Sequence, residues 1–346
     1  MAGVSLGTVS NVLNETASVK ESTRKRVQEA VHAARYKPSQ LARALRRDHS
    51  NVIGMIIPDI TNPFFPAVVR GAEDVAFSNG YRLILCNTDN DHDKELVHLN
   101  ELRTYLPAGL IVIPSNFSEL TMHAETYRQA NTSVVCIDRL PKDWSGDSVT
   151  ANNEMGAYNA IHCLLQLRHT KLAMITGPLY LTNANERLRG FKRALRDAKV
   201  NIAPEYVQET TFDKEGGYAK ALAMLRLVPR PSAIFAGNDL IAIGILLALR
   251  DVGLRCPHDV SIIGFDDLDL AEVTNPSLSS VSQSGYELGL TAARILVERI
   301  QGDLGPAKQI VLETSLKIRG SVGPPPTERP TAANRPRRSK APTGRH

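Results

Sequence analysis

The sequence has few of the features that mark membrane, secreted and metal-binding proteins. No run of about 18 apolar residues occurs, so no membrane-spanning helix is expected. No basic-then-apolar signal segment opens the chain. Neither a zinc-binding spacing nor a dense disulfide framework is formed by the four cysteines, Cys86, Cys136, Cys163 and Cys256. We therefore expect a cytoplasmic protein with reduced thiols, no metal site and no membrane contact.

Motifs of the common α/β enzymes are also missing. No Gly-x-Gly-x-x-Gly or Walker loop follows a strand-like run, and the sequence contains no nucleophile elbow. Carboxylates at strand ends are nevertheless where α/β enzymes keep catalytic groups, so an enzyme is one rival interpretation. We expect no catalytic residues and no cofactor.

Positive charge is concentrated at the two ends of the chain. Residues 1–50 carry a net charge of +5, and residues 324–346 carry another +5. Because the whole chain of 346 residues is also +5, residues 51–323 must carry −5. Basic ends of this kind are suited to gripping a polyanion such as DNA.

The first basic region contains two short helical patterns. Ser5 is a candidate N-cap, and Val9, Val12 and Leu13 then repeat at helical spacing. A second amphipathic pattern covers residues 21–35. Small hydrogen-bonding side chains suit a major groove, and they cover the other face of the first helix: Thr8, Ser10, Asn11 and Asn14. The alternative is a helical pair whose basic face is merely solvated.

Residues 36–47 predict a short hinge helix. Pro38 favours a helix start, and apolar residues recur at spacings of three and four up to Leu45. A helix this short is unstable alone in water and should form only when DNA or a partner copy holds it. A solvated linker is the alternative.

From Asn51 onward, apolar strand-like runs alternate with amphipathic helical stretches. The strand-like runs are 52–57, 83–86, 110–113, 134–137, 172–175, 233–236 and 262–265, with a late strand at 308–318. The helical stretches are 63–79, 92–106, 117–130, 153–168, 185–199, 215–227, 240–252 and 285–302. This alternation predicts an α/β fold with two doubly wound parallel-sheet lobes and a cleft between them, behind a small all-α head.

These patterns predict four regions in a chain too long for one core. We expect a DNA-binding head at 1–37, a hinge and linker at 38–50, two lobes at 51–322, and a disordered basic tail at 323–346. The first lobe should comprise about 51–150 and 285–308. The second should comprise about 151–284 and 309–322.

With these regions defined, the chain resembles the LacI/GalR (lactose repressor-like) family of bacterial transcription regulators, whose lobes are periplasmic-binding-protein-like. The matching phrases occur in family order and spacing across most of residues 2–320: Ala2-Gly-Val-Ser-Leu-Gly-Thr-Val-Ser-Asn11, Tyr36-Lys-Pro-Ser39 with Leu41-Ala and Leu45, Ile53-Gly-Met-Ile-Ile-Pro-Asp59, Thr61-Asn-Pro-Phe-Phe65, Arg187-Leu-Arg-Gly-Phe191, Asn238-Asp239, Ile263-Gly-Phe-Asp-Asp267 and Pro276-Ser-Leu-Ser-Ser-Val-Ser-Gln283.

The resemblance implies that residues 5–14 form the recognition helix of a helix-turn-helix, and that Leu45 is an apolar wedge in the minor groove. A core leucine is the alternative for Leu45. The implied DNA-binding residues are Ser5, Leu6, Gly7, Thr8, Ser10, Asn11, Ser39 and Leu45. Family heads begin with another helix before Ala2, so we expect a truncated helix-turn-helix that binds operator DNA poorly.

The resemblance also implies an effector site in the cleft, with residues suited to a polyol such as a sugar. The implied residues are Asp59, Asn62, Phe64, Phe65, Asp138, Arg187, Phe212, Asn238, Asp239, Asp266 and Gln283. Two alternatives stay open: Asp239 could cap the helix at 240, and Asp138 with Arg139 could be an exposed pair.

Taken together, these patterns predict an effector-controlled transcriptional regulator, a repressor, whose expected partners are palindromic operator DNA, a small carbohydrate and a second copy of the chain. No heptad run of leucines follows the lobes, which favours a dimer over a tetramer. The rival functions are a sensor that has lost DNA binding and a solute-binding protein of the same fold.

Overall fold

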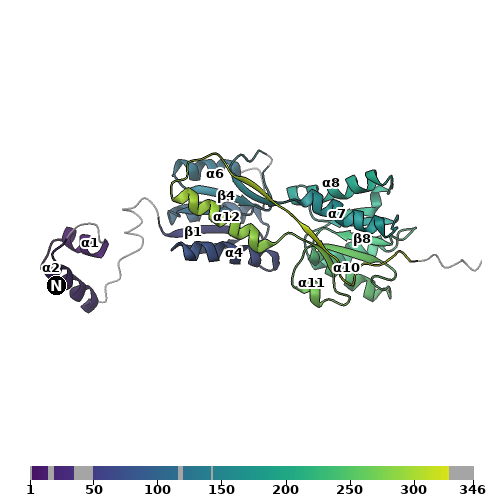
Figure 1. Ribbon diagram of the computed structural model, residues 1–346, viewed down its shortest axis with the longest axis horizontal. Helices are drawn as coiled ribbons and strands as arrows, with labels where there is room; N and C mark the ends of the chain where they lie inside the picture. The colour runs from purple at the N-terminus through teal and green to yellow at the C-terminus, as the bar shows by residue number, and fades with distance from the viewer. Residues whose placement is uncertain (1, 15–18, 35–49, 116–119, 142, 327–346) are drawn as a thin grey trace, which may run out of the picture.

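The computed structural model describes residues 2–14, 19–34, 50–115, 120–141 and 143–326. They form a small helical head and two α/β lobes (Figure 1). The expected hinge at 36–47, with Ser39 and Leu45, lies outside the described residues. Nearly all of the expected tail also lies outside them.

The head consists of α1 (Leu6–Asn14) and α2 (Glu21–Ala33), which contact each other. The Ser5 hydroxyl accepts a hydrogen bond from the Thr8 backbone N–H at 3.2 Å, which confirms Ser5 as a cap. One valine of each helix is buried, Val12 in α1 and Val27 in α2. Helical spacing in the sequence therefore located both helices and their contact face.

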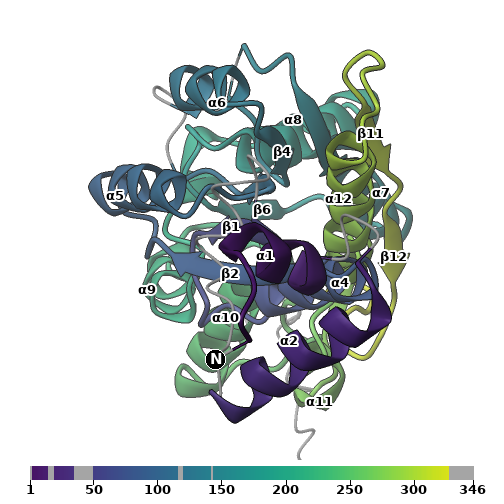
Figure 2. The same ribbon diagram turned by 90° about the vertical axis from the view of Figure 1, so that its left-hand side faces the viewer.

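The first lobe is built on a six-stranded parallel sheet in the order β11-β5-β4-β3-β1-β2. Its strands are β1 (Val52–Ile57), β2 (Arg82–Asn87), β3 (Gly109–Val112), β4 (Ser133–Ile137), β5 (Asp147–Ala151) and β11 (Gln309–Leu312). Helices cover both faces, as a buried parallel sheet requires. They are α4 (Phe64–Ser78) and α12 (Gly285–Ile300) on one face, and α5 (His92–Thr104) and α6 (Leu120–Gln129) on the other (Figure 2).

The side chains of β1 pack alternately against the two faces of the sheet. Ile53, Met55 and Ile57 pack in the cluster with α4 and α12, whereas Ile56 packs in the cluster with α5. Successive side chains of a strand point to opposite faces, so a strand covered on both sides must be apolar throughout. This is why the strands read as continuous apolar runs.

The second lobe repeats the arrangement with the order β12-β10-β9-β8-β6-β7, parallel except for β12. Its strands are β6 (Leu172–Thr176), β7 (Val207–Glu209), β8 (Ala233–Ala236), β9 (Ser261–Asp266), β10 (Ser279–Ser282) and β12 (Ser315–Lys317). One face is covered by α7 (Asn153–Gln166) and α8 (Thr182–Asp197), the other by α9 (Lys214–Met224) and α10 (Asp239–Asp251). Two short helices, η1 (Pro204–Tyr206) and α11 (Leu270–Val273), complete it.

The last part of the chain differs from the prediction in two ways. The single strand expected at 308–318 is two strands: β11 pairs with β5 in the first lobe, and β12 pairs with β10 in the second. The assignment of 309–322 to the second lobe is therefore wrong for Gln309–Leu312. A continuous β pattern does not reveal which sheet each half joins, because pairing depends on distant partners.

The expectation of disorder from Gly323 is also wrong at its first residue. The Gly323 carbonyl oxygen lies 2.8 Å from Nε2 of the buried His169, and the Gly323 N–H donates to the Ser261 hydroxyl at 3.1 Å. Backbone hydrogen bonds to neighbouring groups fix this glycine although its sequence context is rich in proline. Among the described residues, no helix is long and apolar enough to span a membrane.

Candidate functional site: an interlobe pocket

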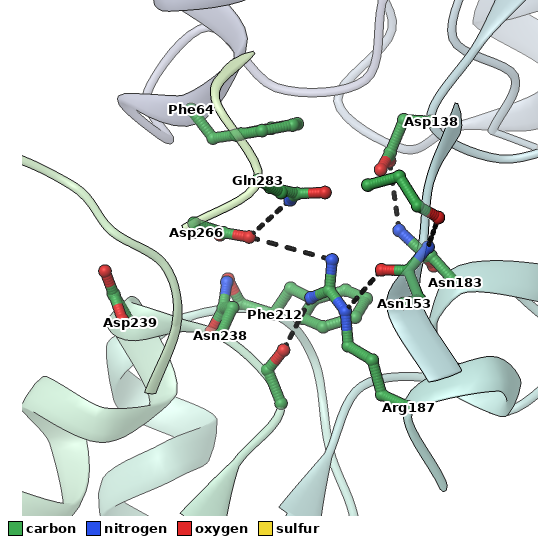
Figure 3. A network of polar contacts seen from close by, with 12 residues as sticks. Phe64, Asp138, Asn153, Asn183, Arg187, Phe212, Asn238, Asp239, Asp266 and Gln283 are labelled. Atoms are coloured by element: carbon green, nitrogen blue, oxygen red, sulfur yellow. Dashed lines mark hydrogen bonds and ion pairs between the residues drawn. The ribbon is translucent and has the colours of Figure 1, made fainter. Parts of the chain in front are cut away.

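A pocket of about 400 Å³ lies between the lobes, at the carboxyl ends of their strands. This is where α/β sheets with crossover helices place ligands, since the strand-to-helix loops converge there. Its walls combine aromatic rings with charged and amide side chains, and Figure 3 shows the central polar group. The lining residues of the first lobe are Asp59, Thr61, Asn62, Phe64, Phe65, Asp89, Asn90, Asp138 and Arg139. Those of the second are Pro178, Tyr180, Leu181, Asn183, Arg187, Thr211, Phe212, Asp213, Asn238, Asp266 and Gln283.

Arg187 is the centre of this polar group, and only 2% of its surface is exposed. Its Nε donates to Asn153 Oδ1 at 2.9 Å, and its Nη1 donates to the Gly237 carbonyl oxygen at 2.6 Å. The guanidinium carbon lies 3.7 Å from the centre of the Phe265 ring. A guanidinium fixed by directional bonds and a ring beneath it offers its remaining N–H groups in one orientation only.

Asp266 at the end of β9 faces Arg187. Its Oδ1 lies 3.7 Å from Arg187 Nη2 and accepts a hydrogen bond from Gln283 Nε2 at 2.6 Å. Burial raises the pKa of the Asp266 carboxyl well above its usual range, and the guanidinium opposes this shift. Burial also lowers the pKa of Arg187, against the attraction of Asp266. The guanidinium and the carboxyl thus lie side by side in the wall of the pocket.

Asp138 connects the lobes across the pocket. Asn183 Nδ2, on α8, donates to Asp138 Oδ2 at 3.0 Å. A second bond joins the lobes nearby, from the Leu140 N–H to the Thr182 hydroxyl at 3.0 Å. Asp138 and Arg139 are both buried, with Asp138 Oδ2 3.6 Å from Arg139 Nε, so they are not an exposed pair.

Several residues of the pocket form local hydrogen bonds that fix the conformation of its loops. Asp59 Oδ1 accepts from the N–H and the hydroxyl of Thr61, at 2.8 and 2.6 Å. Asn62 Oδ1 accepts from the Phe64 N–H at 3.1 Å, which sets the start of α4. Asn238 caps α10 by accepting from the Ile241 N–H at 2.9 Å. These residues hold the walls in position as well as facing the pocket.

Among the described residues, some buried polar atoms at the pocket lack a hydrogen-bond partner. Asp138 Oδ1 and Gln283 Oε1 are such acceptors, and Arg139 Nε is such a donor. A buried polar group without a partner costs about 1–3 kcal/mol, so a ligand that supplies the missing bonds is favoured there. Adjacent hydroxyl groups can both donate and accept, and aromatic rings can cover C–H faces. The arrangement is suited to a small polyol.

Asp239 is the one predicted effector residue that the structure places elsewhere. Its Oδ1 accepts from the Ser280 hydroxyl at 2.6 Å, and its Oδ2 accepts from the Leu268 N–H at 2.8 Å. Asp239 does not line the pocket. It does not cap α10 either, because the N-cap of that helix is Asn238. Burial raises the pKa of Asp239 to about 7. Asp239 ties α10 to β10, a role that depends on a strand distant in sequence.

The structure adds pocket residues that the sequence interpretation missed. Asp89 and Asn90 come just after β2. The carboxyl ends of parallel strands point at the cleft, so the position of these two residues could have predicted that they line the pocket. Asn183 and Tyr180 gave no such signal, since they follow β6 by several residues in a segment whose path depends on packing.

The predicted DNA-binding residues that the structure describes lie together on α1 and its cap. Gly7 is exposed, and Thr8, Ser10 and Asn11 are partly exposed. The side chain of Leu6 is outside what the structure describes, as are Ser39 and Leu45. One face of α1 thus offers short polar side chains, as a groove-reading helix requires.

Residues 1–39 match the bacterial regulatory proteins of the lacI family, and residues 161–322 match the periplasmic binding protein-like domain. The repressor PurR of Aliivibrio salmonicida is 36% identical over 301 residues, covering 87% of this chain and 90% of its own length. The ribose operon repressor of Escherichia coli is 35% identical over 322 residues, covering 93% and 97%. The chain belongs to the LacI family.

Solved structures of LacI-family proteins have the same fold. A regulator from Enterococcus faecium with bound ribose is 31% identical, with a TM-score of 0.72, covering 79% of this chain and 99% of its own. The lac repressor dimer bound to operator and an anti-inducer is 25% identical, with a TM-score of 0.80 and coverages of 92% and 96%. These comparisons confirm the family and the fold class predicted from the sequence, and the relatives named here are transcriptional regulators.

Proposed function

We propose that this LacI-family chain is a cytoplasmic transcriptional repressor that binds a palindromic operator as a homodimer and is controlled by a small uncharged polyol. The observation that carries the proposal is the buried group of Arg187, Asp266 and Gln283, facing Asp138 across a pocket of about 400 Å³. This volume suits a mono- or disaccharide. The pocket binds its ligand and does not convert it.

Ribose is the first ligand to test. One relative is named a ribose operon repressor, and one similar structure contains ribose. The first test is isothermal titration of the full chain with D-ribose, with cellobiose as the second ligand because a similar structure is a cellobiose complex. We expect saturable binding of one sugar per chain. If neither of these sugars binds, and no member of a panel of other pentoses, hexoses and nucleosides binds either, the proposal is contradicted.

The head supplies the second half of the proposal. Ser5 caps α1, and Gly7, Thr8, Ser10 and Asn11 lie along the helix. The hinge residues Ser39 and Leu45 complete the predicted DNA contacts. A gel shift on the upstream region of the chain's own gene, at fixed salt and with or without the bound sugar, tests this half. We expect the chain to retard the DNA fragment to an extent that changes when sugar is added. Equal retardation with and without sugar would mean that the pocket does not control DNA binding by the head.

The oligomeric state is tested by light scattering. We expect twice the chain mass of 37.8 kDa at micromolar concentration. A stable tetramer, or a monomer only, would contradict the homodimer. The measurement reports the mass of the assembly and does not depend on which residues form the dimer interface.

A further inference from the structure

The effector pocket has a buried inner part and an open outer part. The inner part holds the polar group around Arg187 (Figure 3), whose members are all buried: Asp138, Asn183, Arg187, Asn238, Asp266 and Gln283. The outer part is lined by exposed side chains from four strand-to-helix loops: Thr61, Asp89, Asn90, Tyr180 and Thr211. A ligand that fills only the inner part leaves these outer side chains in water.

Tyr180 is the aromatic residue of the outer part. It is 62% exposed although it lines the pocket, whereas Phe64 and Phe65 of the inner part are buried. A tyrosine combines an apolar ring with a polar hydroxyl, and its ring favours packing against another ring. The outer part therefore offers an uncovered aromatic surface to a ligand that reaches it.

The backbone of Tyr180 is held in a tight turn between β6 and α8. The Leu181 N–H donates to the Pro178 carbonyl oxygen at 3.0 Å, which closes the turn around Tyr180. The Leu179 N–H donates to Glu209 Oε1 at 3.0 Å, which ties the turn to β7. Because the backbone is already ordered, a ligand that packs on Tyr180 does not have to order this segment.

The turn meets the first lobe at the mouth of the pocket. Two residues after Tyr180, the Thr182 hydroxyl accepts a hydrogen bond from the Leu140 N–H at 3.0 Å. Burial lowers the pKa of Arg139, and Tyr180 is among the groups that oppose this shift, so Tyr180 lies within electrostatic range of the guanidinium. Arg139 Nη1 in turn donates to Asn90 Oδ1 at 3.3 Å. Tyr180 of the second lobe and Asn90 of the first thus line the mouth from its two sides.

Arg139 lies at the boundary between the inner and outer parts. It contacts the exposed Asn90, and its guanidinium carbon lies 5.9 Å from the centre of the buried Phe65 ring. Only 3% of Arg139 is exposed, and among the described residues its Nε has no hydrogen-bond acceptor. A ligand atom that accepts this bond is favoured there. In a ligand with two linked rings, the oxygen or nitrogen atoms next to the linkage are such acceptors.

The charges at the mouth favour an uncharged second ring. Three carboxyl groups line the pocket on its open side: Asp59, Asp89 and Asp213. Asp89 pairs with Lys94 at 2.5 Å, but within the described part of the chain Asp59 and Asp213 form no ion pair. Carboxylates without a nearby cation repel a phosphate or carboxylate group of a ligand.

We propose that Tyr180 and Asn90 form an outer subsite, which binds a second, uncharged ring linked to the polyol in the inner part. Tyr180 packs against the face of this ring, and Arg139 Nε donates to an acceptor beside the linkage. The inference rests on the proposed function, because it requires that the inner part binds a polyol. It names the effector class more narrowly, as a two-ring glycoside whose second ring is a sugar or a heterocycle.

The first experiment compares two-ring ligands with one-ring ligands that keep the same inner sugar. Isothermal titration of the full chain uses cellobiose against methyl β-D-glucoside, and adenosine against methyl β-D-ribofuranoside. Each methyl glycoside keeps the linkage oxygen or its position but lacks the second ring. We expect the two-ring ligand of at least one pair to bind about fivefold tighter or more, a factor within the range that aromatic packing supplies. The pair that shows the difference identifies the second ring as a sugar or a heterocycle.

The second experiment assigns this difference to Tyr180. In Tyr180→Ala we expect the two members of that pair to bind with nearly equal affinity, while the affinity for the methyl glycoside changes less than about twofold. Tyr180→Phe keeps the ring and should keep the preference. The matched control is Tyr105→Ala, because Tyr105 is 52% exposed but lies just before β3, at the amino end of the sheet and away from the pocket. Equal thermal unfolding of all variants shows that the fold is intact.

Four results would overturn the inference. If the methyl glycosides bind as tightly as the two-ring ligands, the pocket binds a sugar but has no outer subsite. If Tyr180→Ala keeps the preference, or weakens both members of the pair equally, Tyr180 does not bind the second ring. If Tyr180→Phe loses the preference, the hydroxyl and not the ring is responsible. If the natural chain binds none of the four ligands and no other polyol, the proposed function fails and this inference fails with it.

Discussion

The two lobes share one strand order but contribute differently to the pocket between them. In the second lobe, Arg187 is bonded to Asn153 and Gly237 and faces Asp266, all within the lobe. In the first lobe, Asp138 finds its side-chain hydrogen bond across the pocket, from Asn183. The second lobe is thus a prebuilt half-site, whereas in the first lobe the Asp138 carboxylate receives its side-chain hydrogen bond from the other lobe. A shared strand order does not imply an equal share of the binding chemistry.

The largest expected effect comes from breaking the prebuilt half-site. Arg187→Ala leaves Asp266 buried without its cation, and removing one member of a buried pair costs about 3–5 kcal/mol. We expect this loss in the free energy of unfolding of the second lobe, measured by urea denaturation, and at least about a tenfold weaker sugar affinity by titration.

The matched control for this variant is Arg189→Ala on the same helix. Arg189 pairs with Glu154 at 3.0 Å, but its side chain is 55% exposed. Such surface pairs contribute about 0–1 kcal/mol. Equal losses in the two variants would show that burial of Arg187 is not what matters, and unchanged sugar affinity in Arg187→Ala would remove it from the site.

A pH dependence of similar size is expected from Asp239 in the second lobe. Its pKa is raised from 3.8 to about 7 because burial disfavours the carboxylate. The folded state therefore binds a proton that the unfolded state loses, so stability is present in full below about pH 4 and falls as the pH rises to about 7. At 1.36 kcal/mol per pKa unit, the loss is on the order of 4 kcal/mol.

Asp239→Asn should remove this dependence. The difference in unfolding free energy between the variant and the natural chain, measured from pH 4.5 to 8, should shift in favour of the variant as pH rises. Glu95→Gln tests a buried carboxyl of the first lobe, whose pKa burial also raises. A constant difference for Asp239→Asn across this range would contradict the assignment.

Helix packing should respond alike in the two lobes, at a smaller cost. Gly289 of α12 lies against the Val68 carbonyl of α4, and Gly190 of α8 lies against the Glu154 carbonyl of α7. A Cβ at either position would overlap that oxygen, and overpacking costs about 1–3 kcal/mol. Urea denaturation of Gly289→Ala and Gly190→Ala should show it, with Glu287→Ala, exposed on α12, as the control. If neither glycine variant lowered the free energy of unfolding, the paired helices would be able to move apart and accommodate the added methyl group.

The smallest effect tests the contact between the half-sites. Asn183→Ala removes the bond to Asp138, worth about 0.5–1.5 kcal/mol. We expect sugar affinity to fall less than in Arg187→Ala, and small-angle scattering to show a more open sugar-free protein. Asn185→Ala, on the same helix and exposed, is the control. An effect as large as that of Arg187→Ala would mean that the first lobe carries as much of the site as the second.

Much of the fold and most of the site could be predicted from the sequence. Apolar runs located β1, β4 and β8 to within about a residue, because a strand buried on both faces must be apolar throughout its length. Short strands with few apolar residues, such as β7 and β10, were missed. The predicted effector residues apart from Asp239 line the pocket. The family resemblance located them, and the strand rule by itself accounts for those at or just after strand ends, such as Asp59, Asp138 and Asp266. That they bind an effector remains a prediction.

The sequence by itself determined where the apolar strands and the longer helices occur, because burial imposes a local periodicity that each of these segments carries in its own residues. Only the tertiary structure decided which distant groups meet. It split residues 309–317 between two sheets, turned Asp239 toward Ser280 instead of the pocket, and brought Asn183 to Asp138. The physical reason is that a hydrogen bond or a strand pairing depends on a partner's position in space, which the packing of the whole lobe sets.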